Sequence, residues 1–129
     1  MNAAAVFQRA IDITVDYTKE RKAFGRSLSD NQWIGFKLAE MQTEVEALNA
    51  LNWKGVEMVV AGQDATKVAT MAKLMAGKLS RTLPDGCLQF WGGMGYSDES
   101  EISRLYRDAR LTAIGGGADG RLQRVDRHV

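Results

Sequence analysis

The chain has 129 residues, of which 45% are hydrophobic and 26% are charged, as in an ordinary soluble globular domain. Its 17 basic and 16 acidic residues leave a net charge of +1, which argues against a dedicated nucleic-acid-binding protein. One cysteine, Cys87, and one histidine, His128, exclude an internal disulfide and disfavour a metal site. There is neither a run of about 18 apolar residues nor a signal-peptide pattern. We therefore expect no metal, no nucleic acid, no membrane span and a cytoplasmic setting.

Apolar residues recur at intervals of three and four positions through the first ninety residues, which is the spacing of one helix face. This spacing predicts helices over 2–24, 30–60 and 64–91, followed by shorter ones over 98–108 and 114–126. A helix over 30–60 would be about 46 Å long at the usual rise per residue. Long helices joined by short connections run antiparallel, so we expect an all-α, up-and-down helical bundle.

The apolar face of the second predicted helix is the longest in the chain. Its members face a partner helix in the prediction: Ile34, Leu38, Met41, Val45, Leu48, Asn52, Val56 and Val59.

Glycines and capping residues predict where these helices begin and end. Gly25 is expected to end the first helix and Gly62 the second. The candidate caps are Ser27, Ser29 or Asp30 for the second helix and Asp64 for the third. Within the third helix, Pro84 cannot donate to the carbonyl group of Ser80 and clashes with it, which predicts a kink or a break before Asp85.

The glycine-rich segment 115–120 formally matches the G-x-G-x-x-G pattern of dinucleotide-binding folds. That site needs a strand before the glycines, and a helix, a second strand and an acidic residue after them. Only nine residues follow Gly120, so this unit cannot be completed and a Rossmann site is disfavoured.

Two other segments each allow two interpretations. Residues 21–25, Arg-Lys-Ala-Phe-Gly, are either a solvated basic helix end or a phosphate-binding arginine beside an aromatic ring. Residues 89–96, Gln-Phe-Trp-Gly-Gly-Met-Gly-Tyr, are either a helix cap and turn or a place where backbone approaches a ligand.

In their order and spacing, the segments of this chain resemble the C-terminal helical domain of flavin-dependent acyl-CoA dehydrogenases. The matching pieces are Tyr17–Gly25, Gln32, Leu38–Met41, Ala72–Leu74, Asp85–Gln89, Gly92–Tyr96 and Arg104–Arg110. The resemblance spans essentially the whole chain, so it implies one domain of this type over residues 1–129. The family also implies an N-terminal helical domain and a middle β-domain, which this chain does not include.

The resemblance implies an FAD-dependent α,β-dehydrogenation of an acyl-CoA thioester, in which a carboxylate removes the α-proton and hydride leaves for the flavin. It also implies subunit association, with FAD bound partly across a subunit boundary. The positions that match cofactor-binding residues of the family are Arg21, Phe24, Gln32, Gln89, Gly92 and Gly93.

The usual catalytic glutamate is absent from this chain. Ile114–Ala118 matches the family segment Ile-Tyr-Glu-Gly-Thr, which puts Gly116 at the base position. This is the pattern of a subgroup whose base lies near the start of the domain's first helix, at a place that falls just before Met1. We therefore expect no catalytic residue here, a substrate-facing role for Gly115, Gly116 and Gly117, and poor FAD binding and no turnover by the chain alone.

Three functions remain open at this point. The first is the C-terminal domain of an acyl-CoA dehydrogenase, contributing FAD contacts, subunit association and a wall of the acyl pocket. The second is a non-catalytic, oligomeric interaction module derived from that family, which Ala118 and Gly120 favour because the family usually has polar residues there. The third is a protein that binds flavin or acyl-CoA without turnover. For the helical bundle itself we expect a homo-oligomer, with Trp33, Phe36 or Trp53 contributing to the interface.

Overall fold

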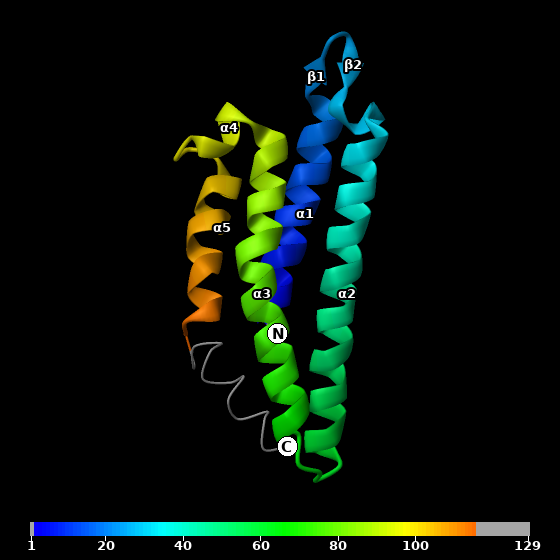
Figure 1. Cartoon of the computed structure of the whole chain (residues 1–129), viewed down its shortest axis with the longest axis vertical. Coiled ribbons are helices and arrows are strands. Elements are labelled where there is room, and N and C mark those ends of the chain that lie inside the picture. The colour runs from blue at the N-terminus through cyan, green and yellow to red at the C-terminus, as the bar shows by residue number, and fades with distance from the viewer. Residues whose placement is uncertain (1, 116–129) are drawn as a thin grey trace.

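The computed structural model describes residues 2–115 and has four main helices packed side by side (Figure 1). These are α1 (Asn2–Glu20), α2 (Gln32–Val60), α3 (Thr66–Trp91) and α5 (Glu101–Ala109). The expected all-α, up-and-down bundle is confirmed. The shorter elements are β1 (Lys22–Ala23), β2 (Arg26–Ser27), η1 (Leu28–Asp30), α4 (Gly93–Tyr96) and η2 (Arg110–Ala113).

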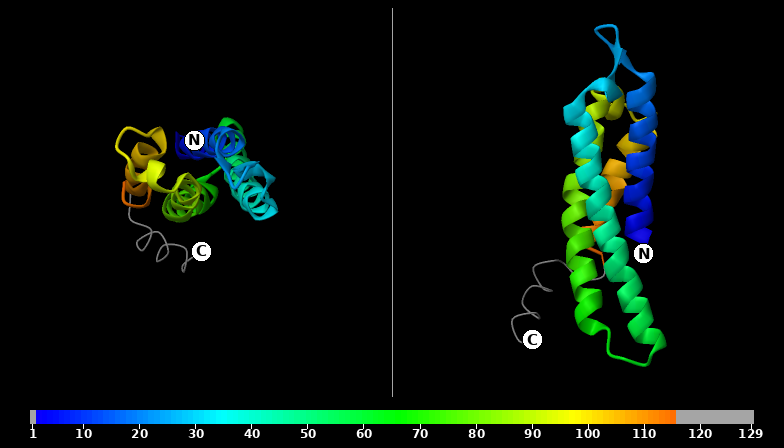
Figure 2. Two further views of the ribbon diagram at one scale, coloured as in Figure 1. Left: turned by 90° about the horizontal axis from the view of Figure 1, so that it is seen from above. Right: turned by 90° about the vertical axis from the view of Figure 1, so that its right-hand side faces the viewer.

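The core lies where α1 and α5 pack against α2 and α3. Its largest fully buried side chains include Phe7 from α1, Leu48 from α2, Leu79 and Leu83 from α3, and Ile102 from α5. Viewed down the bundle, these four helices surround one common interior (Figure 2). An ion pair on the surface joins Arg9 of α1 to Glu101 of α5 through two bonds of 2.9 Å.

The α2–α3 pair continues beyond the N-terminal end of α1, as the side view makes clear (Figure 2). We call this part, residues 51–75, the two-helix extension. Val68 is buried there, whereas Val56 and Val59 are 37% and 65% exposed. The prediction that these two valines continue a covered face is therefore wrong for the part of the chain that the structure describes, because no third helix reaches them.

The first helix is shorter than predicted. It ends at Glu20 instead of continuing to residue 24, and Gly25 lies in a hairpin turn and does not end the helix. β1 and β2 are antiparallel, with Ala23 opposite Arg26, so Phe24 and Gly25 form the two-residue turn. Both have positive φ angles, 53° and 78°, as the type I′ hairpin turn requires. Helical periodicity could not reveal this local change.

The cap of the second helix lies one residue after the last of the expected caps. Asn31 is the cap, and its Oδ1 atom accepts a hydrogen bond from the Trp33 amide at 3.0 Å. The predictions of Ser27, Ser29 or Asp30 were wrong for this helix, because Ser27 instead caps the preceding η1 turn. At the other end, Gly62 with φ of 71° follows the last helical residues, as predicted.

The third helix runs through Pro84 to Trp91, so the expected break before Asp85 is wrong. Leu83, Pro84 and Cys87 are all buried against the neighbouring helices, and this burial offsets the lost backbone hydrogen bond. At the start of the helix, the Asp64 carboxylate accepts the Thr66 amide at 2.9 Å, although the capping residue itself is Ala65.

The last two predicted helices differ in outcome. The helix expected over 98–108 is present as α5, which begins three residues later because Ser100 caps it. The helix expected over 114–126 falls almost wholly outside the described residues, and η2 ends at Ala113. Within residues 2–115, no helix is both long and apolar enough to span a membrane.

Candidate functional site at the end of the bundle

A recess of about 500 Å³ lies where the C-terminal ends of α1 and α3 meet. Its walls come from Tyr17 and Arg21 on one side and from the α3–α4 junction on the other, with Leu28 of η1 between them. The remaining lining residues form one continuous segment, Gln89–Met94. We call this site the junction recess. It combines segments that lie about seventy residues apart in the sequence.

Arg21 is held at the edge of the junction recess by its backbone. Its amide donates to the carbonyl of Tyr17 at 2.8 Å, and its own carbonyl accepts the amide of Leu28 at 2.9 Å. The side chain is exposed, and among the described residues no carboxylate pairs with its guanidinium. Within residues 2–115, Arg21 therefore presents an unpaired cation with five hydrogen-bond donors.

The opposite wall is a glycine turn. Gly92 has φ of 57° and ψ of −139°, a backbone conformation that is essentially restricted to glycine. A Cβ atom added at Gly92 or Gly93 would meet nothing within 4 Å, so the backbone of this turn is open to approaching groups. Gln89, one turn earlier on α3, is also exposed and adds a side-chain amide.

An aromatic stack connects the two walls. The rings of Tyr17 and Trp91 lie with their centroids 4.0 Å apart and their planes 14° from parallel. From the sequence alone, neither ring was predicted to take part in the ligand site. The available signal was spacing, since Tyr17 lies one helical turn before Arg21 and Trp91 directly precedes Gly92.

The structure brings together four of the six predicted cofactor-binding residues in the junction recess: Arg21, Gln89, Gly92 and Gly93. Phe24 and Gln32 do not line it. Phe24 lies at the tip of the β1–β2 hairpin and is fully exposed, while Gln32 is exposed at the first position of α2. The β1–β2 hairpin and the start of α2 are at the same end of the bundle as α4, beside which the recess lies (Figure 1).

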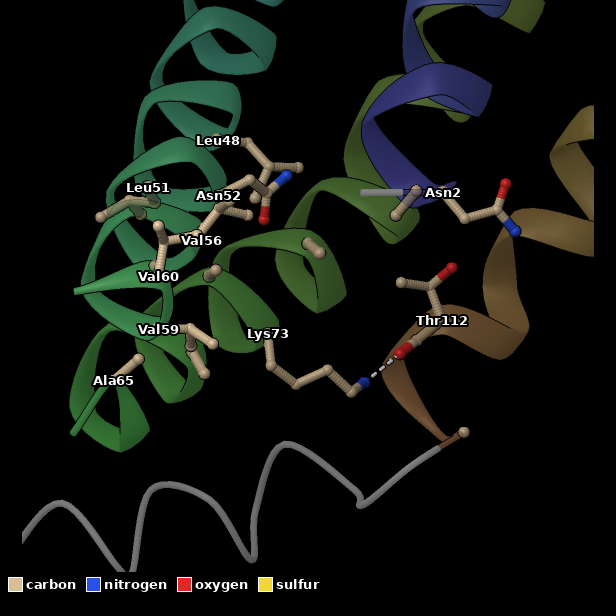
Figure 3. A pocket seen from close by; sticks show the side chains of 16 residues that line it. Asn2, Leu48, Leu51, Asn52, Val56, Val59, Val60, Ala65, Lys73 and Thr112 are labelled. Carbon is tan, nitrogen blue, oxygen red and sulfur yellow. Dashed lines mark hydrogen bonds between the residues drawn. The ribbon is translucent and has the colours of Figure 1, made fainter. Parts of the chain in front are cut away.

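A second concavity lies at the other end, between the two-helix extension, the start of α1 and η2 (Figure 3). This apolar groove has a volume of about 630 Å³, and its walls are mainly alanine, valine and leucine. Lys73 is the only charged residue among the described residues that line it, and its Nζ atom donates to the carbonyl of Thr112. Gly115 also lines the groove. The other two predicted substrate-facing glycines, Gly116 and Gly117, lie outside the described residues.

The remaining titratable groups do not form a reactive cluster in the described part of the chain. Burial raises the pKa of the Cys87 thiol to about 11, so almost none of it is the nucleophilic thiolate at neutral pH. Among residues 2–115, no three His, Cys, Asp or Glu side chains are grouped as metal ligands would be.

Comparison with known proteins connects this geometry to a family. Residues 1–125 match the family model for the acyl-CoA dehydrogenase C-terminal domain. The chain belongs to the acyl-CoA dehydrogenase family. It is 39% identical over 112 residues to the 3-(aryl)acrylate reductase of Clostridium sporogenes, covering 87% of this chain and 30% of that protein. It is also 39% identical over 112 residues to the mitochondrial short-chain specific acyl-CoA dehydrogenase of Bos taurus, covering 87% and 27%.

Solved structures of the acyl-CoA dehydrogenase family share the fold. Butyryl-CoA dehydrogenase from Megasphaera elsdenii superposes with a TM-score of 0.94 at 32% identity, and the match covers 98% of this chain and 33% of that one. The chain thus spans about 30% of the length of the curated relatives that it matches. Within the family, this sequence corresponds to the C-terminal helical domain.

Proposed function

We propose that this chain acts as the C-terminal domain of an FAD-dependent acyl-CoA dehydrogenase. In this role it supplies part of the FAD-binding surface, contacts between subunits and one wall of the acyl pocket. The junction recess is the observation that carries the proposal, because it gathers Arg21, Gln89, Gly92 and Gly93 from two distant segments into one site.

The chemistry of the junction recess suits the diphosphate part of FAD. A guanidinium forms charge-assisted, two-point hydrogen bonds to phosphate oxygens. An open glycine backbone admits the same oxygens without a side chain in the way. Arg21, the Gln89 amide and the Gly92–Gly93 turn would hold the cofactor. The stacked rings of Tyr17 and Trp91 would exclude water from one side. When bound, FAD supplies the electron acceptor for dehydrogenation.

The apolar groove is where we place the acyl-pocket wall. Gly115 lines it, and an acyl chain gains about 0.8 kcal/mol for each methylene that leaves water. Proton abstraction needs a base within hydrogen-bond reach of the substrate. Gly116 has no side chain to accept a proton, so the chain alone should not oxidise an acyl-CoA. Flavin-dependent turnover by the purified chain, lost in an Arg21→Ala variant, would contradict this.

Titration of the isotope-labelled chain with FAD tests the cofactor site directly. Even at a dissociation constant near millimolar, we expect saturable shifts in the backbone amide signals of Gly92 and Gly93. Arg21→Ala should abolish these shifts, because it removes the recess cation. The matched control is Arg104→Ala, an exposed arginine of α5 outside the recess. Shifts that are absent, or equal in both variants, would refute the proposal.

A second candidate function is a non-catalytic, oligomeric interaction module. The observation that favours it is the large exposed apolar side chains of α2: Trp33, Phe36 and Trp53 are 55%, 59% and 58% exposed. Both candidates predict self-association, so only the FAD titration separates them. Association without any change at Gly92 and Gly93 would favour the interaction module.

A further inference from the structure

We propose that Tyr17, Trp91 and Thr14 form a positioning clamp that holds the two walls of the junction recess at the separation its ligand needs. The inference rests on the proposed FAD site, and it assigns a role to residues that do not themselves supply the phosphate-binding groups. The clamp acts through Arg21 on α1 and through the Gly92–Gly93 turn after α3.

Three contacts fasten Trp91 to α1. Its ring stacks on Tyr17, its indole Nε1 donates to the Thr14 hydroxyl at 3.0 Å, and its carbonyl accepts the Tyr17 hydroxyl at 3.4 Å. The Thr14 hydroxyl in turn donates to the carbonyl of Ala10 at 2.6 Å, which leaves its oxygen lone pairs turned toward the indole. Thr14 is completely buried, so water cannot replace the indole as its donor.

The contact between α1 and α3 at this point determines where both walls lie. Arg21 follows Tyr17 by one helical turn and is bonded to its carbonyl, so the position of Tyr17 determines the position of the Arg21 backbone. Gly92 follows Trp91 directly, so the place of Trp91 determines where the glycine turn begins. A clamp between residues 17 and 91 therefore fixes the distance between the cation and the open backbone.

The turn after Trp91 is packed against the Cβ of the same residue. Gly95 is buried, and a Cβ atom there would lie 2.9 Å from the Cβ of Trp91 and 3.0 Å from the carbonyl oxygen of Leu88. α4 can thus take its position only while Trp91 keeps its place. The stacked pair thus joins the two walls of the recess, and the side chain of Trp91 also packs against the glycine turn.

A preformed recess has a measurable advantage. A ligand that had to order two loose segments would lose binding free energy for each side chain and turn that it immobilised. The clamp removes that cost because the walls are already in place. Weakening the clamp should therefore reduce affinity even when Arg21, Gln89 and the glycines are all unchanged.

The separation of the walls can be measured without any ligand. Spin labels on cysteines introduced at Lys22 and Met94, both exposed, report the distance between the two walls in the full chain, and the buried Cys87 should not take up label. We expect one narrow distance distribution. Thr14→Val, which removes the acceptor, and Tyr17→Leu, which removes the stack, should each broaden it.

Two matched variants separate a positioning role from general destabilisation. Ser80→Ala removes another buried hydroxyl that bonds to a carbonyl of its own helix, at 2.7 Å, but away from the recess. It should lower stability and leave the distance distribution narrow. Tyr17→Phe keeps the ring and loses only the long 3.4 Å bond, so it should restore the narrow distribution that Tyr17→Leu loses.

FAD titration then connects the clamp to binding. Thr14→Val should weaken FAD by about three- to tenfold, the effect of one lost hydrogen bond, whereas Ser80→Ala should not. A distribution that stays narrow in Thr14→Val and Tyr17→Leu, or a broad one with unchanged affinity, would overturn the clamp. An unsubstituted chain with no FAD-induced shifts would instead refute the proposed function, so the two failures are distinguishable.

Discussion

The part of α2 before residue 51 and the part after it belong to the same continuous helix but lie in different surroundings. Near Leu48, which is 1% exposed, α1 covers the helix and closes a core. Past residue 51, α3 is the only helix within residues 2–115 that accompanies it, and Val59 and Val60 are 65% and 83% exposed. The apolar spacing of a helix therefore identifies the face that seeks a partner, whereas the presence of a partner depends on how far the neighbouring helices reach.

Charge introduced into the covered end should have the largest effect. Leu48→Asp places a carboxylate in the core without a partner, at a cost of several kcal/mol out of a total stability of about 5–15 kcal/mol. We expect loss of the cooperative thermal transition in circular dichroism. Val59→Asp, on the same helix in the two-helix extension, should change the midpoint little. A soluble Leu48→Asp variant with an unchanged thermal midpoint would show that this part of α2 is not covered as described.

Glycine-to-alanine substitutions should change the free energy of unfolding in opposite directions in the closely packed turn after α3 and in the two-helix extension. Gly95→Ala introduces a Cβ at 2.9 Å from that of Trp91, and overpacking of this kind costs about 1–3 kcal/mol. Gly55→Ala in the two-helix extension meets only Val68 Cγ1, at 3.7 Å, and should stabilise the helix by about 0.5–1 kcal/mol. Chemical denaturation measures both. If both substitutions changed the free energy of unfolding in the same direction, close packing would not be what distinguishes the two regions.

The exposed apolar surface of α2 should drive self-association. We expect a dimer or higher oligomer in sedimentation experiments at micromolar concentration. Trp53→Glu replaces a 58%-exposed indole with a charge and should weaken association about tenfold or more, as loss of an interface tryptophan commonly does. Glu57→Gln, on an exposed position one turn further along, is the control. A monomeric mass for the unsubstituted chain would refute this prediction.

The smallest effect should come from the surface ion pair at the covered end. The hydrogen bond from Arg9 lowers the pKa of Glu101 in the folded chain. A carboxylate with a lowered pKa stabilises the fold above its unfolded pKa, and this contribution disappears as pH falls through the folded value. Glu101→Gln should therefore lower the melting midpoint slightly at pH 7, and this difference should shrink as the pH is lowered through the acid range. A difference that persists in acid would exclude ionisation as its cause.

The fold could be predicted further than the site. Periodicity indicated the long helices because each repeats the same spacing over many turns, and Gly62 marked the end of α2 correctly. The hairpin at residues 22–27 was missed because Phe24 is not a residue that favours positive φ, so local chemistry gave no turn signal. Pro84 stayed inside α3 because burial outweighed the lost hydrogen bond, which only the folded neighbours reveal.

The junction recess shows where sequence reasoning reaches its limit. Family resemblance pointed to Arg21, Gln89, Gly92 and Gly93, which the structure places together. For Trp91, the sequence alone predicted no role in the site. Its contacts with Thr14 and Tyr17 join positions more than seventy residues apart, and no local pattern contains that information.

Phe24 has a consequence for how this chain could change over generations. A phenylalanine at φ of 53° is strained by roughly 1 kcal/mol relative to glycine or asparagine, and its fully exposed ring gains no burial in return. Phe24→Asn or Phe24→Gly should therefore give a more stable bundle. Selection for stability alone would replace the aromatic ring at this hairpin tip. Among the described contacts, none favours phenylalanine over asparagine or glycine at this position.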